Sequence, residues 1–219
     1  MSSAKAEALL KMLELKNLPA DSDIALDISE ELLYELKTQG IINVESGLIK
    51  VVNPIGLAIE AIKLGIDVEA ASRWLSWRDF EKFCVEALTN HNFRVKAPLR
   101  FKCDKKRYEV DVVAVKHKIV LCLDCKHWKM KGYQSYKIKE AAVKHLDKCL
   151  KLTELTSTLR DAGLHVQSGD LMIPLIVTLM DLGFKSPVNE VLVIPIFKFN
   201  SFLLDLEAHI DEVPSIEIR

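Results

Sequence analysis

Two stretches of the chain are apolar on both faces and yet carry aspartates, and this combination restricts the fold more than any other feature. The runs Val110–Val115 and Ile119–Lys126 contain Asp111 and Asp124. Continuous apolar runs are typical of strands covered on both sides, where an ionised carboxylate needs a partner or a metal ion. The sequence therefore predicts two central strands, each with a carboxylate that needs a charged or hydrogen-bonding partner or a metal ion.

Asp124 and Lys126 are predicted to form a site together with Asp111. Side chains in a strand alternate with period two, so Asp124 and Lys126 point to the same face. If the strands bring Asp111 beside Asp124, the two charges repel by about 4 kcal/mol at ~4 Å in an effective dielectric of ~20. Mg²⁺, or Mn²⁺, relieves this repulsion, and Lys126 suits an attacking water or a charged transition state. The alternative interpretation is a structural Asp124–Lys126 ion pair.

Glu81 is the fourth candidate residue. It shares one ridge of a predicted helix with Cys84, Val85 and Leu88, at spacings of three, four and seven residues. An acid on an apolar ridge is expected to lean toward the core and the site. The alternative is a half-exposed carboxylate that interacts favourably with the helix dipole.

Periodicity predicts the order of elements around these strands. After the helix through Phe80 and Leu88, the predicted elements are strands at Phe93–Val95, Tyr108–Val115 and Ile119–Lys126, a long helix at Ser135–Ala162, strands at Leu175–Met180 and Val191–Phe197, and a helix at Phe202–Ala208. Pro174 and Pro195 suggest strand ends or edges. This order predicts an α/β fold with a sheet flanked by helices.

Residues 1–66 are predicted to form a separate winged-helix-like domain, with residues 67–219 as the second domain. Ser29 or Asp27 can cap one helix, Asn53-Pro54 opens another, and residues 41–52 read as a hairpin. The helix that would read DNA carries Glu30, Glu31 and Glu35, and residues 1–66 hold 10 acids against 6 bases. Because acidic faces repel phosphate, we expect a role in protein contact or dimerisation.

The charge is distributed unevenly along the chain. The formal net charge is −1, but residues 94–151 hold 17 basic and 6 acidic side chains. Such a block favours a polyanion, here DNA, with a solvated surface as the alternative. The residues predicted to contact DNA are Arg100, Lys102, Lys105, Lys106, Arg107, Lys129 and Lys131.

The five cysteines predict reduced thiols in a cytoplasm, because their number is odd and their spacing fits no disulfide framework. The first residues also contain no apolar stretch of the kind found in signal peptides. Cys122 and Cys125 with His127 suggest zinc, but residues three apart in a strand face opposite sides, so both thiols cannot bind one ion.

These motifs together resemble the PD-(D/E)xK nuclease superfamily, with Mrr-type restriction endonucleases and archaeal Holliday-junction resolvases as the most similar branches. The resemblance rests on Glu81 in its helix, on Glu109-Val110-Asp111, and on Asp124-Cys125-Lys126-His127-Trp128. It covers roughly residues 67–208. It implies a restriction-endonuclease-like α-β-β-β-α-β core and magnesium-dependent hydrolysis of DNA phosphodiesters.

Carried over residue by residue, the resemblance implies metal binding by Asp111, Asp124 and the Cys125 carbonyl, catalysis by Lys126, and Glu81 as an additional acid. Many such enzymes act as homodimers, which the N-terminal domain could form. His145 stands where the family often has a glutamine. The alternative function is therefore a DNA-binding regulator or scaffold whose nuclease-like domain does not cut.

Overall fold

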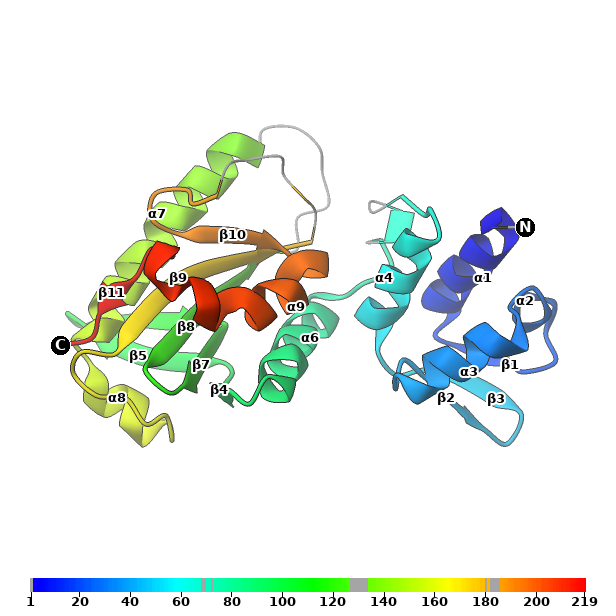
Figure 1. Cartoon of the computed structure of the whole chain (residues 1–219), viewed down its shortest axis with the longest axis horizontal. Coiled ribbons are helices and arrows are strands. Elements are labelled where there is room, and N and C mark those ends of the chain that lie inside the picture. The colour runs from blue at the N-terminus through cyan, green and yellow to red at the C-terminus, as the bar shows by residue number, and fades with distance from the viewer. Residues whose placement is uncertain (1, 68–69, 72, 127–133, 180, 182–185) are drawn as a thin grey trace. The chain divides into compact units, whose positions relative to one another are not determined.

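The computed structural model describes residues 2–67, 70–71, 73–126, 134–179, 181 and 186–219. Its contacts group residues 1–83 and 84–219 into two compact units, which are described separately (Figure 1). This division falls within helix α6 (Trp77–Asn90), and the domain boundary at residues 66/67 stays a prediction. The start of α6 is bonded within the first unit, where Lys16 Nζ lies 3.6 Å from Asp79 Oδ2.

The first unit contains four described helices before α6 and a three-stranded antiparallel sheet of order β1-β3-β2. Its elements are α1 (Ser2–Leu15), β1 (Asn17–Pro19), α2 (Asp23–Leu26), α3 (Glu30–Thr38), β2 (Ile42–Glu45), β3 (Leu48–Val51) and α4 (Pro54–Lys63). The hairpin predicted at residues 41–52 is confirmed as β2–β3. Assignment to the winged-helix family stays a prediction.

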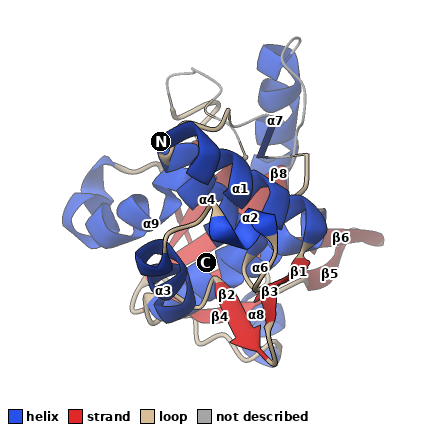
Figure 2. Ribbon diagram, turned by 90° about the vertical axis from the view of Figure 1, so that its right-hand side faces the viewer, coloured by secondary structure: helices blue, strands red, loops and turns tan. Residues whose placement is uncertain are grey.

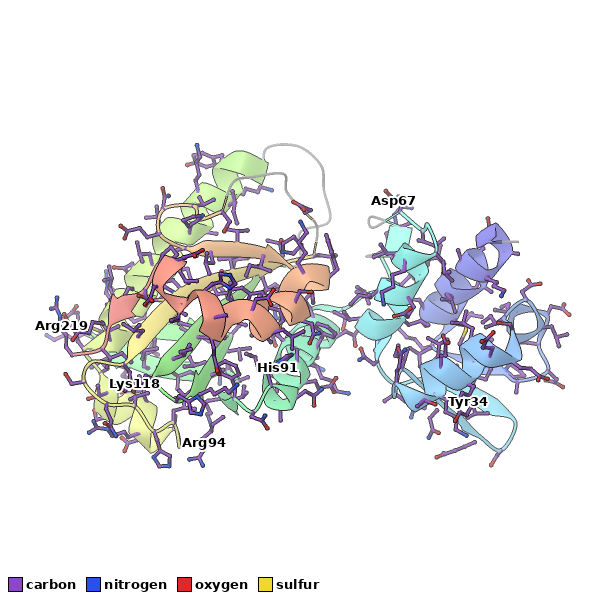
Figure 3. The ribbon with its side chains drawn as sticks, in the orientation of Figure 1. Tyr34, Asp67, His91, Arg94, Lys118 and Arg219 are labelled. Atoms are coloured by element: carbon purple, nitrogen blue, oxygen red, sulfur yellow. The ribbon has the colours of Figure 1, made fainter. Side chains whose placement is uncertain are left out.

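Local capping explains where the helices of the first unit begin. The Ser29 hydroxyl accepts the Leu32 N–H, and the Asn53 side chain accepts the Gly56 N–H, as the sequence predicts. Helix α3 carries the predicted acidic face and leaves Tyr34 72% exposed (Figure 3).

The second unit is built on a six-stranded mixed sheet of order β10-β9-β8-β7-β4, with β11 pairing along β9. Strands β8, β9 and β10 are parallel, whereas β7 is antiparallel to both β4 and β8. The strands are β4 (Arg94–Lys96), β7 (Val112–Lys116), β8 (Ile119–Lys126), β9 (Leu171–Thr178), β10 (Leu192–Pro195) and β11 (Ile216–Glu217). The predicted mixed sheet flanked by helices is confirmed.

Helices cover both faces of this sheet. On one face, Cys125 of β8 lies against Cys84 of α6, and on the other His145 of α7 (Gln134–Thr153) bonds Cys122 of β8. The remaining helices are α8 (Thr156–Asp161), α9 (Ile196–Asp205) and the 3₁₀ helix η1 (Leu206–Glu212). Residues 120–123 of β8 are fully buried, in accordance with their apolar character on both faces.

Several local predictions differ from the structure. The strand predicted at Val191–Phe197 ends at Pro195, and the helix predicted from Phe202 begins at Ile196. The run Tyr108–Val115 is two strands, because the chain bends at Asp111, and β6 (Lys106–Val110) pairs with β5 (Leu99–Cys103) in a separate hairpin. The long helix predicted to Ala162 ends at Thr153. Pro174 lies inside β9, not at an edge. It is tolerated because β11 pairs with residues 171–172 and β10 with residues 175–178, so no partner on that side needs its N–H.

Candidate active site

Asp124 and Lys126 form an ion pair at the end of β8. Lys126 Nζ lies 2.6 Å from Asp124 Oδ2. The Asp124 side chain is 5% exposed, and the Lys126 side chain is 24% exposed. Because the two residues are two apart in a strand, their side chains leave the same face, which here is the face covered by α7. The Asp124 side chain is therefore buried, whereas the Lys126 side chain is partly exposed to solvent.

A second lysine, Lys148 of α7, approaches the same carboxylate from the other side. Its Nζ lies 3.9 Å from Asp124 Oδ1. Lys148 was not among the residues predicted for the site. A signal was present, because Lys148 is three residues after His145 and seven after Ala141, and therefore lies on the helix ridge that faces the sheet. Asp124 thus lies between two cations supplied by different elements.

Asp111 lies at the bend between β6 and β7, next to the same point of β8. Val112 pairs with Leu123 in antiparallel register, so Asp111 and Asp124 both follow that pair at its same end, one on each chain segment. Asp111 is half-buried, and its Oδ2 accepts the backbone N–H of Cys125 at 2.7 Å. The structure therefore brings Asp111 to the Cys125 backbone and Lys126 to Asp124 at this end of β8, and their role as one site stays a prediction.

A cavity of about 350 Å³ opens beside Asp124. It is lined by Asp124, Lys126, Lys137, Glu140, Ala141, Lys144, His145 and Lys148. Four of these side chains are lysines and two are acids, and one acid, Glu140, is paired with Lys144 at 2.5 Å. The cavity thus combines a buried carboxylate with an excess of positive charge, which suits a phosphate group.

His145 lies at this cavity but is itself 1% exposed. Its Nε2 lies 2.8 Å from the Cys122 carbonyl oxygen, so the neutral ring donates its N–H there. Burial lowers the pKa of His145, and the Asp124 carboxylate and the Cys122 carbonyl only partly oppose this shift. His145 Nδ1 is buried without a hydrogen-bond partner among the described residues.

The cysteines of β8 divide between the two faces, as period two requires. Cys125 Sγ lies 3.9 Å from Cys84 Sγ, whereas Cys122 lies with His145 and Cys149 on the α7 face. The hydrogen bond with Cys84, burial and the nearby carboxylates raise the pKa of Cys125 well above its usual value. All five cysteines are free thiols. The cluster of Cys122, His145 and Cys149 was not found from the sequence, although His145 and Cys149 have the i, i+4 spacing of one helix face.

Glu81 lies on α6 within the first unit, before the division at Phe83. It is half-buried, and its carboxylate accepts the indole N–H of Trp77 one turn earlier in the helix. Its assignment to the site stays a prediction.

The predicted DNA-contacting residues of the β5–β6 hairpin are exposed, and the hairpin stands out from the rest of its unit (Figure 2). Arg100, Lys102 and Arg107 border a cavity of about 530 Å³. Arg100 Nε also pairs with Glu109 at 2.5 Å. In the middle of the hairpin, Phe101 stacks on Tyr108 with 5.3 Å between the ring centroids. Lys129 and Lys131 lie outside the described residues.

The donor set at this point of the sheet fits a hard divalent cation. Asp111 and Asp124 supply carboxylate oxygens, and the Cys125 carbonyl would add a neutral oxygen, which is the ligand type that Mg²⁺ and Mn²⁺ prefer. The competing cations are the chain's own Lys126 and Lys148 ammonium groups. A bound ion would therefore take Asp124 from its lysines, which would then be free to contact an anionic substrate.

Among the described residues, no helix combines the length and apolar character needed to cross a membrane.

In comparisons with solved structures, the chain is similar to the protein VC1899 from Vibrio cholerae, at 15% identity and a TM-score of 0.36. It is also similar to Can2 from Sulfobacillus thermosulfidooxidans, solved with cyclic tetra-adenylate, at 11% identity and a TM-score of 0.34. Each alignment covers 96% of this chain and about half of the solved chain, 52% and 50% respectively.

Sequence comparisons give more specific results. An uncharacterised protein from Archaeoglobus fulgidus is 30% identical over 140 residues, which is 63% of this chain and 97% of that protein. The Mrr-type family model of restriction endonucleases matches residues 72–159, the segment that contains Asp111, Asp124, Lys126 and His145. Residues 72–159 therefore match a restriction endonuclease domain.

Proposed function

We propose that the protein is a metal-dependent deoxyribonuclease that hydrolyses DNA phosphodiester bonds. The observation that carries this proposal is the meeting of Asp111, Asp124 and Lys126 at one end of β8, beside a cavity with four lysines. The match of residues 72–159 to a restriction endonuclease domain supports DNA as the substrate. A buried carboxylate next to an anion-binding cavity is otherwise unfavourable, and a divalent cation between carboxylate and phosphate resolves the conflict.

Each residue has a defined role in this proposal. Asp111, Asp124 and the Cys125 carbonyl hold the ion, which supplies Lewis-acid charge beside the phosphate. Lys126 orients the attacking water or stabilises the charge on the transition state, and Lys148 neutralises a non-bridging phosphate oxygen. Water attacks phosphorus, one P–O ester bond breaks, and the leaving oxygen takes up a proton. Glu81 is proposed as an additional acid.

Cleavage of labelled DNA tests the proposal. The full chain is incubated with duplex, single-stranded and branched DNA, with Mg²⁺ or Mn²⁺, alongside the variants Asp124→Asn and Lys126→Ala. Asp147→Asn is the matched control, because Asp147 is an exposed acid of α7 that pairs with Lys151. We expect cleavage by the native chain and the control and none by the two site variants. Cleavage that persists in both site variants would refute the assignment.

The second candidate function is a DNA-binding regulator or scaffold that does not cut. The observation that favours it is the position of Asp124 between Lys126 at 2.6 Å and Lys148 at 3.9 Å, which already balances its charge. Calorimetry with Mn²⁺ separates the two functions. Heat of binding that disappears in Asp124→Asn supports the nuclease. Absence of binding, together with salt-dependent DNA affinity and no cleavage, supports the scaffold.

We also propose that residues 1–66 contact protein, forming a homodimer that could cut two strands. The support is the acidic α3, with Glu30, Glu31 and Glu35, and its exposed Tyr34. Sedimentation of the full chain across a concentration series tests this idea. A Tyr34→Ala variant is expected to weaken self-association, whereas a monomer at all concentrations would exclude the dimer.

A further inference from the structure

Three side chains that bind soft metals meet between β8 and α7, on the same sheet face as Asp124. One ligand atom each from Cys122, His145 and Cys149 lies within 4.8 Å of the others. All three residues are buried, with exposed fractions of 0%, 1% and 0%. They come from two different elements, so the cluster is produced by the packing of α7 on the sheet.

The spacing of these atoms suits a small tetrahedral ion. Cys149 Sγ lies 3.6 Å from His145 Nε2. With Zn–S bonds of ~2.3 Å and Zn–N bonds of ~2.0 Å, tetrahedral angles place sulfur and nitrogen about 3.5 Å apart. The Sγ–Nε2 separation therefore matches that of two ligands of one zinc ion.

We propose that Cys122, His145 and Cys149 bind one thiophilic d¹⁰ ion such as Zn²⁺, at a site separate in chemistry from the carboxylate site. Thiolate and imidazole select zinc over Mg²⁺, whereas carboxylate and carbonyl oxygens select Mg²⁺ or Mn²⁺. Cys125 is not a ligand of this site, because it lies on the opposite face of the sheet with Cys84.

The state of His145 agrees with this assignment. Its Nε2–H now bonds the Cys122 carbonyl, and its Nδ1 is the buried atom without a hydrogen-bond partner among the described residues. Binding of the ion at Nε2 would move the ring proton to Nδ1 and give up the bond to the carbonyl. The change gives up one hydrogen bond and leaves the new Nδ1–H group without an acceptor among the described residues, and the metal–nitrogen bond must outweigh both costs.

The Cys149 thiol is buried within the cluster. Burial and the hydrogen bond with Cys122 raise the pKa of Cys149 well above its usual value. A metal ion would displace the thiol protons and bind the thiolates. An ion at this position would join β8 to α7, and so fix Lys148 relative to Asp124.

Cobalt absorption tests the site directly, because Co²⁺ bound by thiolates in a tetrahedral site absorbs strongly whereas hexahydrated Co²⁺ does not. The full chain is stripped with a chelator under a thiol-free reductant and titrated with Co²⁺ and then Zn²⁺. We expect a tetrahedral spectrum with one Co²⁺ per chain, displaced by one Zn²⁺ and unaffected by excess Mg²⁺. Cys149→Ser and His145→Asn should lose at least about tenfold in affinity.

The matched controls are Cys84→Ser, at the buried pair on the opposite face, and Cys103→Ser, at the half-buried cysteine. Both should keep the native spectrum. No tetrahedral spectrum in the native chain, or one that survives in folded Cys149→Ser, would overturn the proposal.

Alkylation mapped by mass spectrometry keeps the test decisive if a variant fails to fold. In the native chain, Zn²⁺ should slow the modification of Cys122 and Cys149 more than that of Cys84 and Cys125. Equal protection of all four buried thiols, or none, would mean that the cluster is only apolar packing. These readouts do not depend on DNA cleavage, so the site and the nuclease proposal succeed or fail separately.

Discussion

The carboxylate of Asp111 accepts the backbone N–H of Cys125 at 2.7 Å, and so ties the bend after β6 to the peptide that follows Asp124. This bond gives Asp111 a structural role in addition to its proposed role as a metal ligand. It also explains how an acid can lie at a break between two strands, because the carboxylate satisfies an N–H group of the neighbouring strand.

The two roles of Asp111 are separable by substitution. Asp111→Asn keeps an oxygen that can accept the Cys125 N–H, and should retain a neutral bond worth about 0.5–1.5 kcal/mol. Asp111→Ala leaves that N–H unsatisfied and should lower the free energy of unfolding by about 1–3 kcal/mol. Urea denaturation measures this difference. Both variants should weaken Mn²⁺ binding in calorimetry, and full affinity in Asp111→Asn would remove Asp111 from the ligand set.

Lys126 and Lys148 are expected to differ in effect although both contact Asp124. Lys126→Ala should abolish cleavage. Lys148→Ala should mainly weaken DNA binding and reduce the slope of log K against log salt by about the amount that corresponds to one phosphate contact. Single-turnover cleavage and binding measured across a salt series separate the two effects. Lys139→Ala is the control, since Lys139 is an exposed lysine of α7 outside the residues that line the cavity. Equal loss of cleavage in both site variants would contradict the division of roles.

The β5–β6 hairpin is expected to supply affinity without sequence preference. Replacing Lys105 and Lys106 together by alanine should reduce the slope of log K against log salt by about 1.8 for duplex DNA, if each contacts one phosphate. Arg100→Ala should have a smaller effect, because Glu109 already pairs with that guanidinium group. Fluorescence anisotropy with two unrelated duplexes measures both slopes. Lys50→Ala, at an exposed position of β3, is the control.

The burial of His145 predicts loss of stability on acidification. Its pKa is lowered in the folded chain, so between that value and the ordinary value of 6.5 the unfolded chain binds the extra proton. The stabilisation is complete above about pH 6.5 and is lost as the pH falls below it, by at most about 1.4 kcal/mol per pH unit. Denaturation of the metal-free chain from pH 7.5 to 5 should show a shallower decline in His145→Gln than in the native chain. An identical decline would mean that His145 is not buried as a neutral ring.

Much of the second unit was predictable because burial on both faces leaves a strong pattern in a strand. β8 was predicted residue for residue, and the shared face of Asp124 and Lys126 followed from period two. The caps of α3 and α4 were also predictable, since Ser29 and Asn53 bond to groups three residues away. The β5–β6 hairpin was not predicted as a unit, because the strand pattern continues through Asp111 although the pairing partner changes there.

The sequence by itself determined which residues carry charge into an apolar environment and which elements hold them, since periodicity and capping depend on near neighbours along the chain. Only the tertiary structure decided the partners of those charges. Lys148 lies at Asp124, and Cys149 lies with Cys122 and His145, because α7 packs across β8 at one particular position. That position depends on contacts between segments more than twenty residues apart, and no local pattern encodes it.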